Sequence, residues 1–241
     1  SINRTGTIME TNKRDNLYAS WYFASPVYSV LKKEWLKDLD KLSDPYIKIA
    51  KEKTKQHIEE RNKAFGGDKK DHSFVHHSTS LISRPGFKNF TDWVEATTWN
   101  LLDEQGYDLT NYKIFITELW VQEFAEAGGG HHQLHTHYNG HMSGFYFLKC
   151  SEKTSIPIFD DPRPGKIMND LPEKNKEAIT PASSQINYQV QPGHLLMFNS
   201  YLPHQFRVDA GYEPFRFIHF NCRAIPIKDV LSKYDERKTN N

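Results

Sequence analysis

Apolar residues in the first third of the chain recur at helical spacing. Between residues 31 and 42 they lie three or four positions apart, with charged residues between them, which is typical of an amphipathic helix. The pair Asp44-Pro45 predicts a stop and restart, with Asp44 as N-cap and Pro45 in the first turn. Residues 46–64 are polar and basic with few apolar positions, so we expect a partly exposed helix there, ended by Gly66-Gly67. Another helix is expected over residues 88–104.

The pattern changes after residue 108 to one typical of strands. Residues 112–124 are rich in β-branched and aromatic side chains and predict a long strand, which Gly128 to Gly130 interrupt. Residues 131–149 predict two strands joined near Asn139-Gly140, a turn-forming pair. Shorter strands are expected at residues 155–159, 186–190, 194–198, 204–208 and 215–224. About eight short strands at such intervals favour a jelly roll.

The order of elements predicts one structural domain with three parts. Residues 1–108 form an N-terminal strand and a helical buttress, residues 109–228 a β core, and residues 229–241 a C-terminal tail. The expected fold class is therefore mainly β with N-terminal helices. Residues 166–183 are polar and irregular, and we expect them to form an excursion from the core.

Composition excludes few functions, but it gives no sign of a membrane-spanning segment. No stretch of the 241 residues reaches the ~18 consecutive apolar positions that a membrane span needs. The first ten residues lack an apolar run, so no secretory signal is visible, although the sequence starts at Ser1 without a methionine and a removed leader stays possible. Two cysteines, Cys150 and Cys222, favour a reducing cytoplasm over a disulfide framework. A net charge of +1 gives no reason to expect nucleic-acid binding.

Histidines cluster at the start of the β region. Five of the twelve fall between residues 131 and 141. His135 and His137 are two apart, so in a strand they face the same way and can bind one metal ion. His204 follows Pro203 at the start of a later predicted strand and is the best third ligand. A histidine pair alone is more often incidental, but the third histidine between strands favours a metal site.

Arg216 is the candidate partner for an anion. It follows His204 by 12 residues, within an aromatic strand that predicts a half-buried position. A half-buried guanidinium needs an anion, and the far carboxylate of a dicarboxylate such as 2-oxoglutarate would suit it. A surface charge at a sheet edge is the alternative.

The sequence resembles a known family at these residues. The ordered set is similar to putative 2-oxoglutarate/Fe(II) oxygenases of bacteria and tailed phages, in which H-x-H and Asn precede Ser-Gly and an aromatic strand. The resemblance extends over roughly residues 120–224. Its pieces are residues 135–148, 159–163, 192–198, 202–204 and 216–221, with residues 25–28 similar to the opening strand of the family.

The resemblance implies a fold, a cofactor and a reaction. The fold is a double-stranded β-helix, cupin-like and related to prolyl hydroxylases. The implied centre is Fe(II) held by His135, His137 and His204, with 2-oxoglutarate as cosubstrate bound at Arg216. Ser143 and Asn139 are further candidates beside the cosubstrate, and Asn139 is alternatively a turn residue. The implied enzyme is a dioxygenase that hydroxylates a C–H bond, with a protein or peptide side chain such as proline as the family-level substrate.

The sequence departs from the wider superfamily at His137, where a carboxylate ligand is usual. Either the site has three histidines, or His137 is not a ligand and water or a carboxylate replaces it. Asp160 and Asp161 are the nearest candidate acids, although the family pattern suggests a structural turn there. Two other functions stay open: a three-histidine, cupin-type dioxygenase that does not use 2-oxoglutarate, and a metal-stabilised binding module without catalysis.

Overall fold

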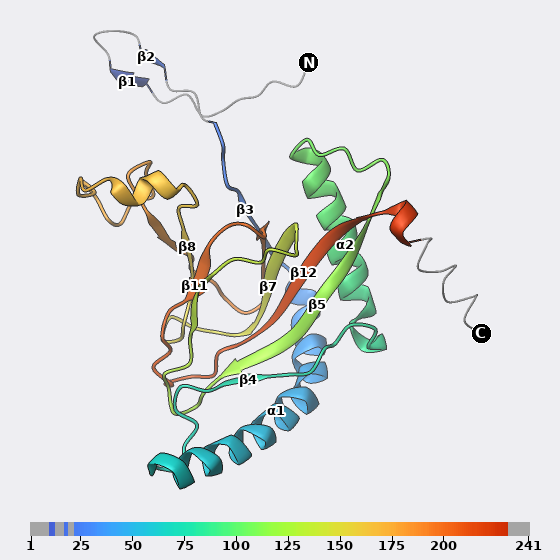
Figure 1. The fold of residues 1–241 in the computed structure, drawn as a ribbon, viewed down its shortest axis with the longest axis vertical. Coiled ribbons are helices and arrows are strands. Elements are labelled where there is room, and N and C mark those ends of the chain that lie inside the picture. Colours follow the sequence, from blue (N-terminus) through green and yellow to red (C-terminus); the bar gives the residue numbers. More distant parts are fainter. Residues whose placement is uncertain (1–9, 13–16, 19–21, 231–241) are drawn as a thin grey trace.

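The computed structural model describes residues 10–12, 17–18 and 22–230 (Figure 1). Its helices are α1 (Leu36–Phe65) and α2 (Lys88–Glu104), with short 3-10 turns at Lys33–Trp35, Pro85–Phe87 and Pro164–Met168. The expected tail from residue 231 onward, and most of the first 21 residues, lie outside the described residues. The strands are β1 (Glu10–Asn12), β2 (Leu17–Tyr18), β3 (Val27–Leu31), β4 (Val75–His77), β5 (Tyr112–Phe124), β6 (His132–His135), β7 (Met142–Lys149), β8 (Pro157–Asp160), β9 (Gln185–Asn187), β10 (His194–Asn199), β11 (His204–Phe206) and β12 (Arg216–Pro226).

Two antiparallel sheets form the β core. One has six strands in the order β3-β10-β7-β12-β5-β4, and the other has four in the order β6-β11-β8-β9. The strands β6 and β7, joined through Asn139-Gly140, belong to different sheets, so this connection crosses from one sheet to the other. The arrangement is the double-stranded β-helix that the family resemblance implies.

Two apolar clusters lie on opposite faces of the six-stranded sheet. One lies between this sheet and the helices, which cover its outer face in Figure 1, and includes Phe90 of α2 and Phe220 of β12. The other fills the space between the two sheets with phenylalanine rings, among them Phe145, Phe206 and Phe217. The six-stranded sheet is therefore buried on both faces, which explains why the sequences of several of its strands are nearly continuous apolar runs.

The predicted helix boundary at Asp44-Pro45 is wrong. A single helix, α1, runs through Pro45 from residue 36 to residue 65. Its buried positions continue across the proline at intervals of three or four: Leu39, Ser43, Ile47, Ala50, Thr54 and Ile58. Packing of this continuous face against the sheet outweighs the backbone hydrogen bond that proline removes.

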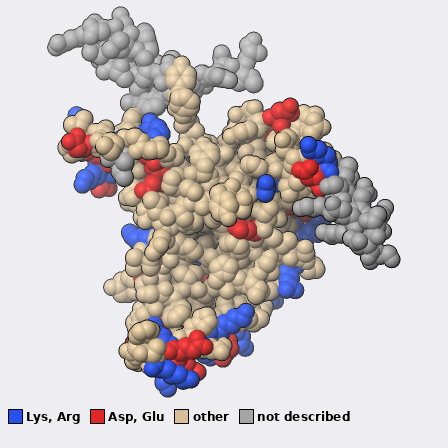
Figure 2. All heavy atoms as spheres, in the orientation of Figure 1, with Lys and Arg blue, Asp and Glu red and all other residues tan. Residues whose placement is uncertain are grey.

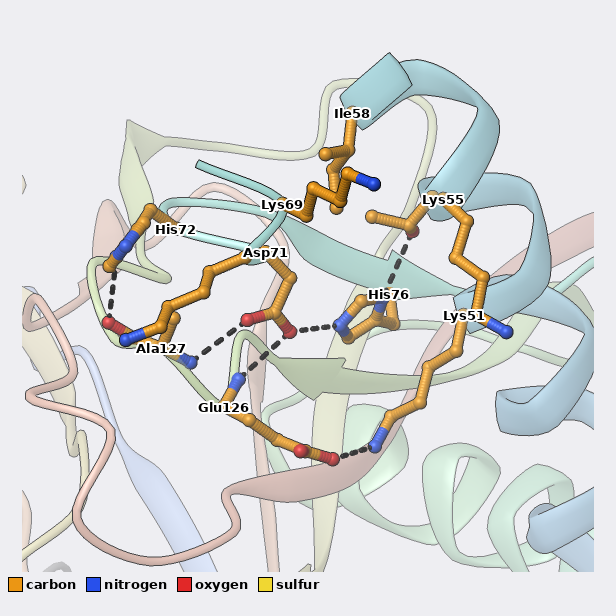
Figure 3. A pocket seen from close by; sticks show the side chains of 11 residues that line it. Lys51, Lys55, Ile58, Lys69, Asp71, His72, His76, Glu126 and Ala127 are labelled. Atoms are coloured by element: carbon orange, nitrogen blue, oxygen red, sulfur yellow. Dashed lines mark hydrogen bonds and ion pairs between the residues drawn. The ribbon is translucent and has the colours of Figure 1, made fainter. Parts of the chain in front are cut away.

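A polar network ties the second half of α1 to β4 (Figure 3). His76 contacts Thr54 of α1 at 2.9 Å and Asp71 at 2.8 Å, and Asp71 also accepts hydrogen bonds from the backbone N–H groups of Glu126 and Ala127. These groups line a cavity of about 490 Å³ together with lysines such as Lys51, which pairs with Glu126. Because the buried polar groups here form hydrogen bonds with one another, we infer that this network stabilises the contact between α1 and β4.

Charged side chains of both signs are interspersed on the face seen in Figure 2, and much of that face carries neither sign. They gather most densely around the end of α1, at the bottom of the view. None of the helices in the described ranges combines the length and apolar content needed to cross a membrane.

Candidate metal centre

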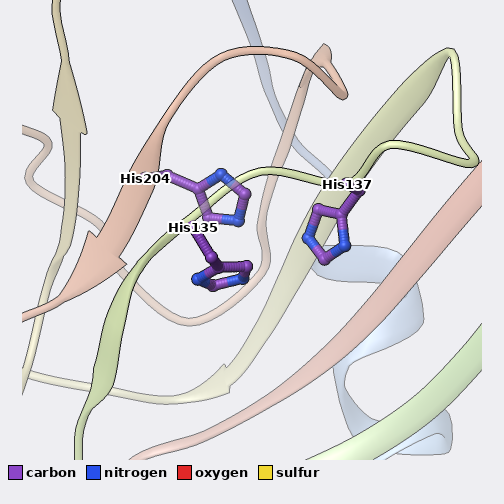
Figure 4. Close-up of side chains that lie close together, drawn as sticks. All are labelled: His135, His137 and His204. Atoms are coloured by element: carbon purple, nitrogen blue, oxygen red, sulfur yellow. The ribbon is translucent and has the colours of Figure 1, made fainter.

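Strand pairing brings the predicted histidines together. His135 ends β6 and lies directly opposite His204, the first residue of β11, so the two ring centroids are 4.4 Å apart. His137 lies just beyond β6 rather than within it, and its backbone N–H donates to the carbonyl of Ser200 at 2.9 Å. Its ring is 5.0 Å from that of His135 and 5.1 Å from that of His204 (Figure 4). One ring nitrogen from each of the three lies within 4.8 Å of the others, a geometry that could hold a metal ion.

Two of the three imidazoles are prepared as ligands by their backbone contacts. The Nδ1–H group of His204 donates to the carbonyl of Leu202 at 2.9 Å, and that of His135 donates to the carbonyl of Gln133 at 2.6 Å. Such contacts fix the tautomer that leaves Nε2 with its lone pair. The Nε2 atom of His204 is buried and has no hydrogen-bond partner. A metal ion would satisfy this otherwise unpaired atom, so the donor set fits Fe(II).

His137 is prepared differently. The amide nitrogen of Asn221 donates to its Nδ1 at 3.2 Å, and the amide orientation is set because Asn221 also donates to Glu118 and accepts from Ser143. With Nδ1 as acceptor, a neutral imidazole carries its proton on Nε2, which is buried and unpartnered. Metal binding through Nε2 requires this proton and the Asn221 contact to rearrange.

Burial keeps His204 and His137 neutral. It is the main cause that lowers the pKa of His204 to about 3, where neighbouring histidines add to the lowering and the hydrogen bond to Leu202 opposes it. Burial, together with the nearby His135, lowers the pKa of His137 to about 4. Desolvation disfavours the imidazolium form. The neutral form is the one that binds metal ions.

A second set of donors adjoins the first. Glu118 of β5 and His219 of β12 lie with His137 so that one ligand atom from each is within 4.8 Å of the others. Neither residue was predicted as a ligand from the sequence. The two candidate acids do not join the histidines: Asp160 accepts from Gln185 and Gln205, and Asp161 pairs with Arg163 in a turn.

The expectation for Arg216 needs correction. Arg216 lies on the face of β12 that turns toward α1, where its guanidinium donates to Glu123 at 2.6 Å, Asp40 at 2.9 Å and Asp44 at 2.6 Å. His219 lies on the opposite face of the same strand, stacked on His137 at 5.0 Å. A buried guanidinium held by three carboxylates already has its anions, so we do not retain Arg216 as the cosubstrate anchor.

The two polar candidates beside the site take different positions. Ser143 is fully buried between the sheets, where its hydroxyl donates to Asn221 at 2.6 Å and contacts Ser200 at 2.9 Å. It therefore acts on the histidines through Asn221. Asn139 is exposed in the turn after His137 and lines a cavity of about 360 Å³ with it.

Two adjoining cavities open beside His137. The smaller, of about 360 Å³, is lined by residues that include Glu118, Asn221 and Arg223. The larger, of about 490 Å³, is lined by residues that include four tyrosines, namely Tyr107, Tyr112, Tyr138 and Tyr201. His137 thus lies where the histidine cluster meets open space.

Comparison with known proteins agrees with this geometry. Residues 118–221, a segment from β5 to β12, match the family described as Putative 2OG-Fe(II) oxygenase. No curated protein matches the chain in sequence.

Solved structures with a similar fold include the non-heme alpha ketoglutarate dependent epimerase SnoN from nogalamycin biosynthesis. It has 9% sequence identity and a TM-score of 0.50, over 83% of this chain and 76% of that one. A Pseudomonas putida prolyl-4-hydroxylase has 8% identity and a TM-score of 0.47, over 82% and 92%. An oxidoreductase of the 2OG-Fe(II) oxygenase family from Burkholderia pseudomallei has 9% identity and a TM-score of 0.41, over 59% of this chain and 60% of that one.

At such low identity, structural likeness shows the fold alone, while the sequence match covers the strands that carry the histidines. Residues 118–221, which make up less than half of the chain, are similar to the family of putative 2OG-Fe(II) oxygenases.

Proposed function

We propose that this protein holds Fe(II) through His135, His204 and His137 and uses 2-oxoglutarate as cosubstrate. The observation that carries the proposal is the convergence of three imidazoles, with the Nε2 atom of His204 buried and unpartnered. When bound, these two groups would supply the decarboxylation of 2-oxoglutarate to succinate, coupled to hydroxylation of a C–H bond by dioxygen. Three neutral ligands leave the charge of the ion uncompensated, which favours an anionic cosubstrate beside it.

The protein itself contributes orientation and exclusion of water. Strand pairing fixes His135 opposite His204, and backbone carbonyls fix the tautomers of both rings. Phe145 and Phe198 pack against the ring of His204, at centroid distances of 5.7 Å and 4.8 Å. This aromatic wall keeps water from that side of the site, so access is from the side of His137.

Arg223 is the cation best placed for the far carboxylate of the cosubstrate. It lines the cavity of about 360 Å³ together with His137. It is exposed, and no carboxylate in the described part of the chain pairs with it. Along β12 it continues the face that carries His219 and Asn221, opposite to the face of Arg216.

Replacing Arg223 with Ala should weaken cosubstrate binding without unfolding the protein. Loss of a charge-assisted hydrogen bond worth about 1.5–3 kcal/mol should raise the 2-oxoglutarate concentration for half-maximal succinate formation by roughly tenfold or more. The measurement is succinate formation against 2-oxoglutarate concentration, with Arg84→Ala, an exposed arginine distant in sequence, as control. An unchanged concentration dependence would remove Arg223 from the site.

The larger cavity suits a peptide substrate. Its tyrosines are exposed at fractions from 40% for Tyr112 to 92% for Tyr138. Grooves lined by exposed aromatic rings bind extended, proline-rich segments well. We therefore propose a proline-containing peptide as substrate and, from the two free cysteines, a cytoplasmic protein.

The direct test is conversion of 2-oxoglutarate to succinate in the presence of Fe(II) and ascorbate, followed by NMR. His204→Ala should reduce succinate to the level of free Fe(II), because it removes the best-prepared ligand. His131→Ala is the matched control, since His131 is exposed and lies outside the cluster.

Two results would favour the other functions. Dioxygen consumption without 2-oxoglutarate would indicate a three-histidine dioxygenase. If neither Fe(II) nor 2-oxoglutarate at millimolar concentration raises the melting temperature, the protein is better described as a binding module.

A further inference from the structure

Three side chains from separate parts of the sequence converge beside the three-histidine site. Glu118 and His219 come from adjacent strands, β5 and β12, in which Glu118 pairs with Asn221 and Trp120 pairs with His219. His137 reaches them from the connection after β6. Their ligand atoms lie within 4.8 Å of one another, the same limit that the three-histidine group meets.

The ring of His219 has an unexplained free nitrogen. His219 is only 4% exposed, and its Nε2 atom is buried with no hydrogen-bond partner. The ring stacks between Trp120 at 5.0 Å and His137 at 5.0 Å, so it cannot turn easily toward solvent. Leaving such an atom buried and unpaired destabilises the fold, and an apolar residue of similar size would avoid that cost.

Glu118 supplies the negative charge that the three-histidine group lacks. Its carboxylate accepts a hydrogen bond from the Asn221 amide, which also donates to His137. Asn221 thus holds Glu118 close to His137, and its contact with His137 rearranges when a metal ion binds, as at the three-histidine position. A divalent ion here would be partly neutralised by its own protein ligand, which the low-dielectric interior favours.

The geometry points to a second metal position formed by Glu118, His137 and His219, which shares His137 with the first. We propose that it binds a divalent first-row ion. Two histidines and one carboxylate are the donor set of many non-haem Fe(II) centres. Two of its members, Glu118 and His137, line the cavity of about 360 Å³, so further coordination positions can face open space. The inference rests on these contacts and does not depend on the use of 2-oxoglutarate.

The test separates the two positions by removing the ligands that belong only to the first. The double variant His135→Ala/His204→Leu keeps Glu118, His137 and His219. We expect it to bind one Co(II) per chain by calorimetry, with visible absorption bands from the bound ion. Adding Glu118→Gln should lower Co(II) affinity by about tenfold or more, since loss of even a supporting residue costs about 10–100-fold. Gln at this position can still accept from Asn221, so the fold is spared.

The control replaces an exposed histidine on α1, His57→Ala, in the same double variant, and should leave Co(II) affinity unchanged. A double variant that folds but binds no Co(II) would overturn the proposal, as would unchanged affinity after Glu118→Gln. If the double variant fails to fold by circular dichroism, His135→Ala alone, at a half-buried position, carries the same comparison with and without Glu118→Gln. Absence of succinate formation would instead contradict the proposed function and leave this result standing.

Discussion

Replacing Arg216 with Ala should destabilise the protein by about 3–5 kcal/mol, the cost typical of removing one partner from a buried ion pair. Glu123 is 3% exposed and would lose the 2.6 Å contact from the guanidinium. Lys51, which pairs with the same carboxylate at 2.6 Å, would remain and favours the lower end of this range. Asp40 and Asp44 would also lose their shared partner, and with it the link between α1 and β12. Urea denaturation measures the change as a lower midpoint at an unchanged slope.

Arg223→Ala is the matched comparison on the same strand. Arg223 is exposed, so its removal should change the free energy of unfolding by no more than about 0.5 kcal/mol. The two substitutions are thus expected to have different effects. Arg216→Ala should lower the free energy of unfolding, whereas Arg223→Ala should raise the 2-oxoglutarate concentration needed for half-maximal succinate formation. The opposite pattern, with Arg216→Ala as stable as the wild type but demanding more 2-oxoglutarate, would restore Arg216 as the cosubstrate anchor.

The wrong prediction for Arg216 shows what the sequence pattern does not determine, which is the direction that each face of a strand takes in the fold. Arg216 and His219 are an odd number of residues apart, so they lie on opposite faces of the strand. This spacing does not say which face is inward, because β12 is apolar on both: Phe217 faces the space between the sheets, and Phe220 faces the helices. The acids Asp40 and Asp44, four residues apart on α1, are the signal for an arginine partner. Which strand the helix covers is a property of the packed fold.

The histidine cluster was easier to predict from the sequence than the role of Arg216. The spacing of His135 and His137, followed by a histidine at the start of a later strand, predicts a cluster that the fold does form. Glu118 was not predictable in the same way, because its place beside His137 depends on the register that pairs it with Asn221 across β5 and β12. Register between strands about a hundred residues apart follows from packing of both faces and not from local pattern.

Strands were also predicted better than the helix boundary. The bounds of β5 agree with the predicted residues 112–124, since a long run of β-branched and aromatic residues ended by glycines leaves few alternatives. Asp44-Pro45 gave the wrong boundary because local capping signals favour a break by only a few kcal/mol. Burial of the whole face of α1, together with the ion pair between Asp44 and Arg216, favours continuity.

Gly144→Ala should be among the most destabilising single-methyl changes in the chain. Gly144 lies in the middle of β7, paired with Met197 on one side and Phe220 on the other. A Cβ atom there would overlap the ring of Phe220 and the backbone carbonyl oxygen of Leu196. The carbonyl belongs to β10 and cannot move without breaking the sheet, and Phe220 is held against Phe90 of α2 at 5.8 Å. Overpacking of a rigid core costs about 1–3 kcal/mol, and we expect the upper end or more here.

The consequence should extend to the metal centre. Displacing Phe220 would shift its neighbours on β12, which are His219 and Asn221, so Co(II) binding should weaken together with stability. Gly165→Ala is the matched control, because a Cβ atom at Gly165 meets nothing within 4 Å and should leave the urea midpoint unchanged. Wild-type stability in Gly144→Ala would mean that β7 and β12 can separate to admit a methyl group. The pairing of these two strands would then be too adaptable to hold His219 and Asn221 in place, and the geometry on which both metal positions depend would lose its support.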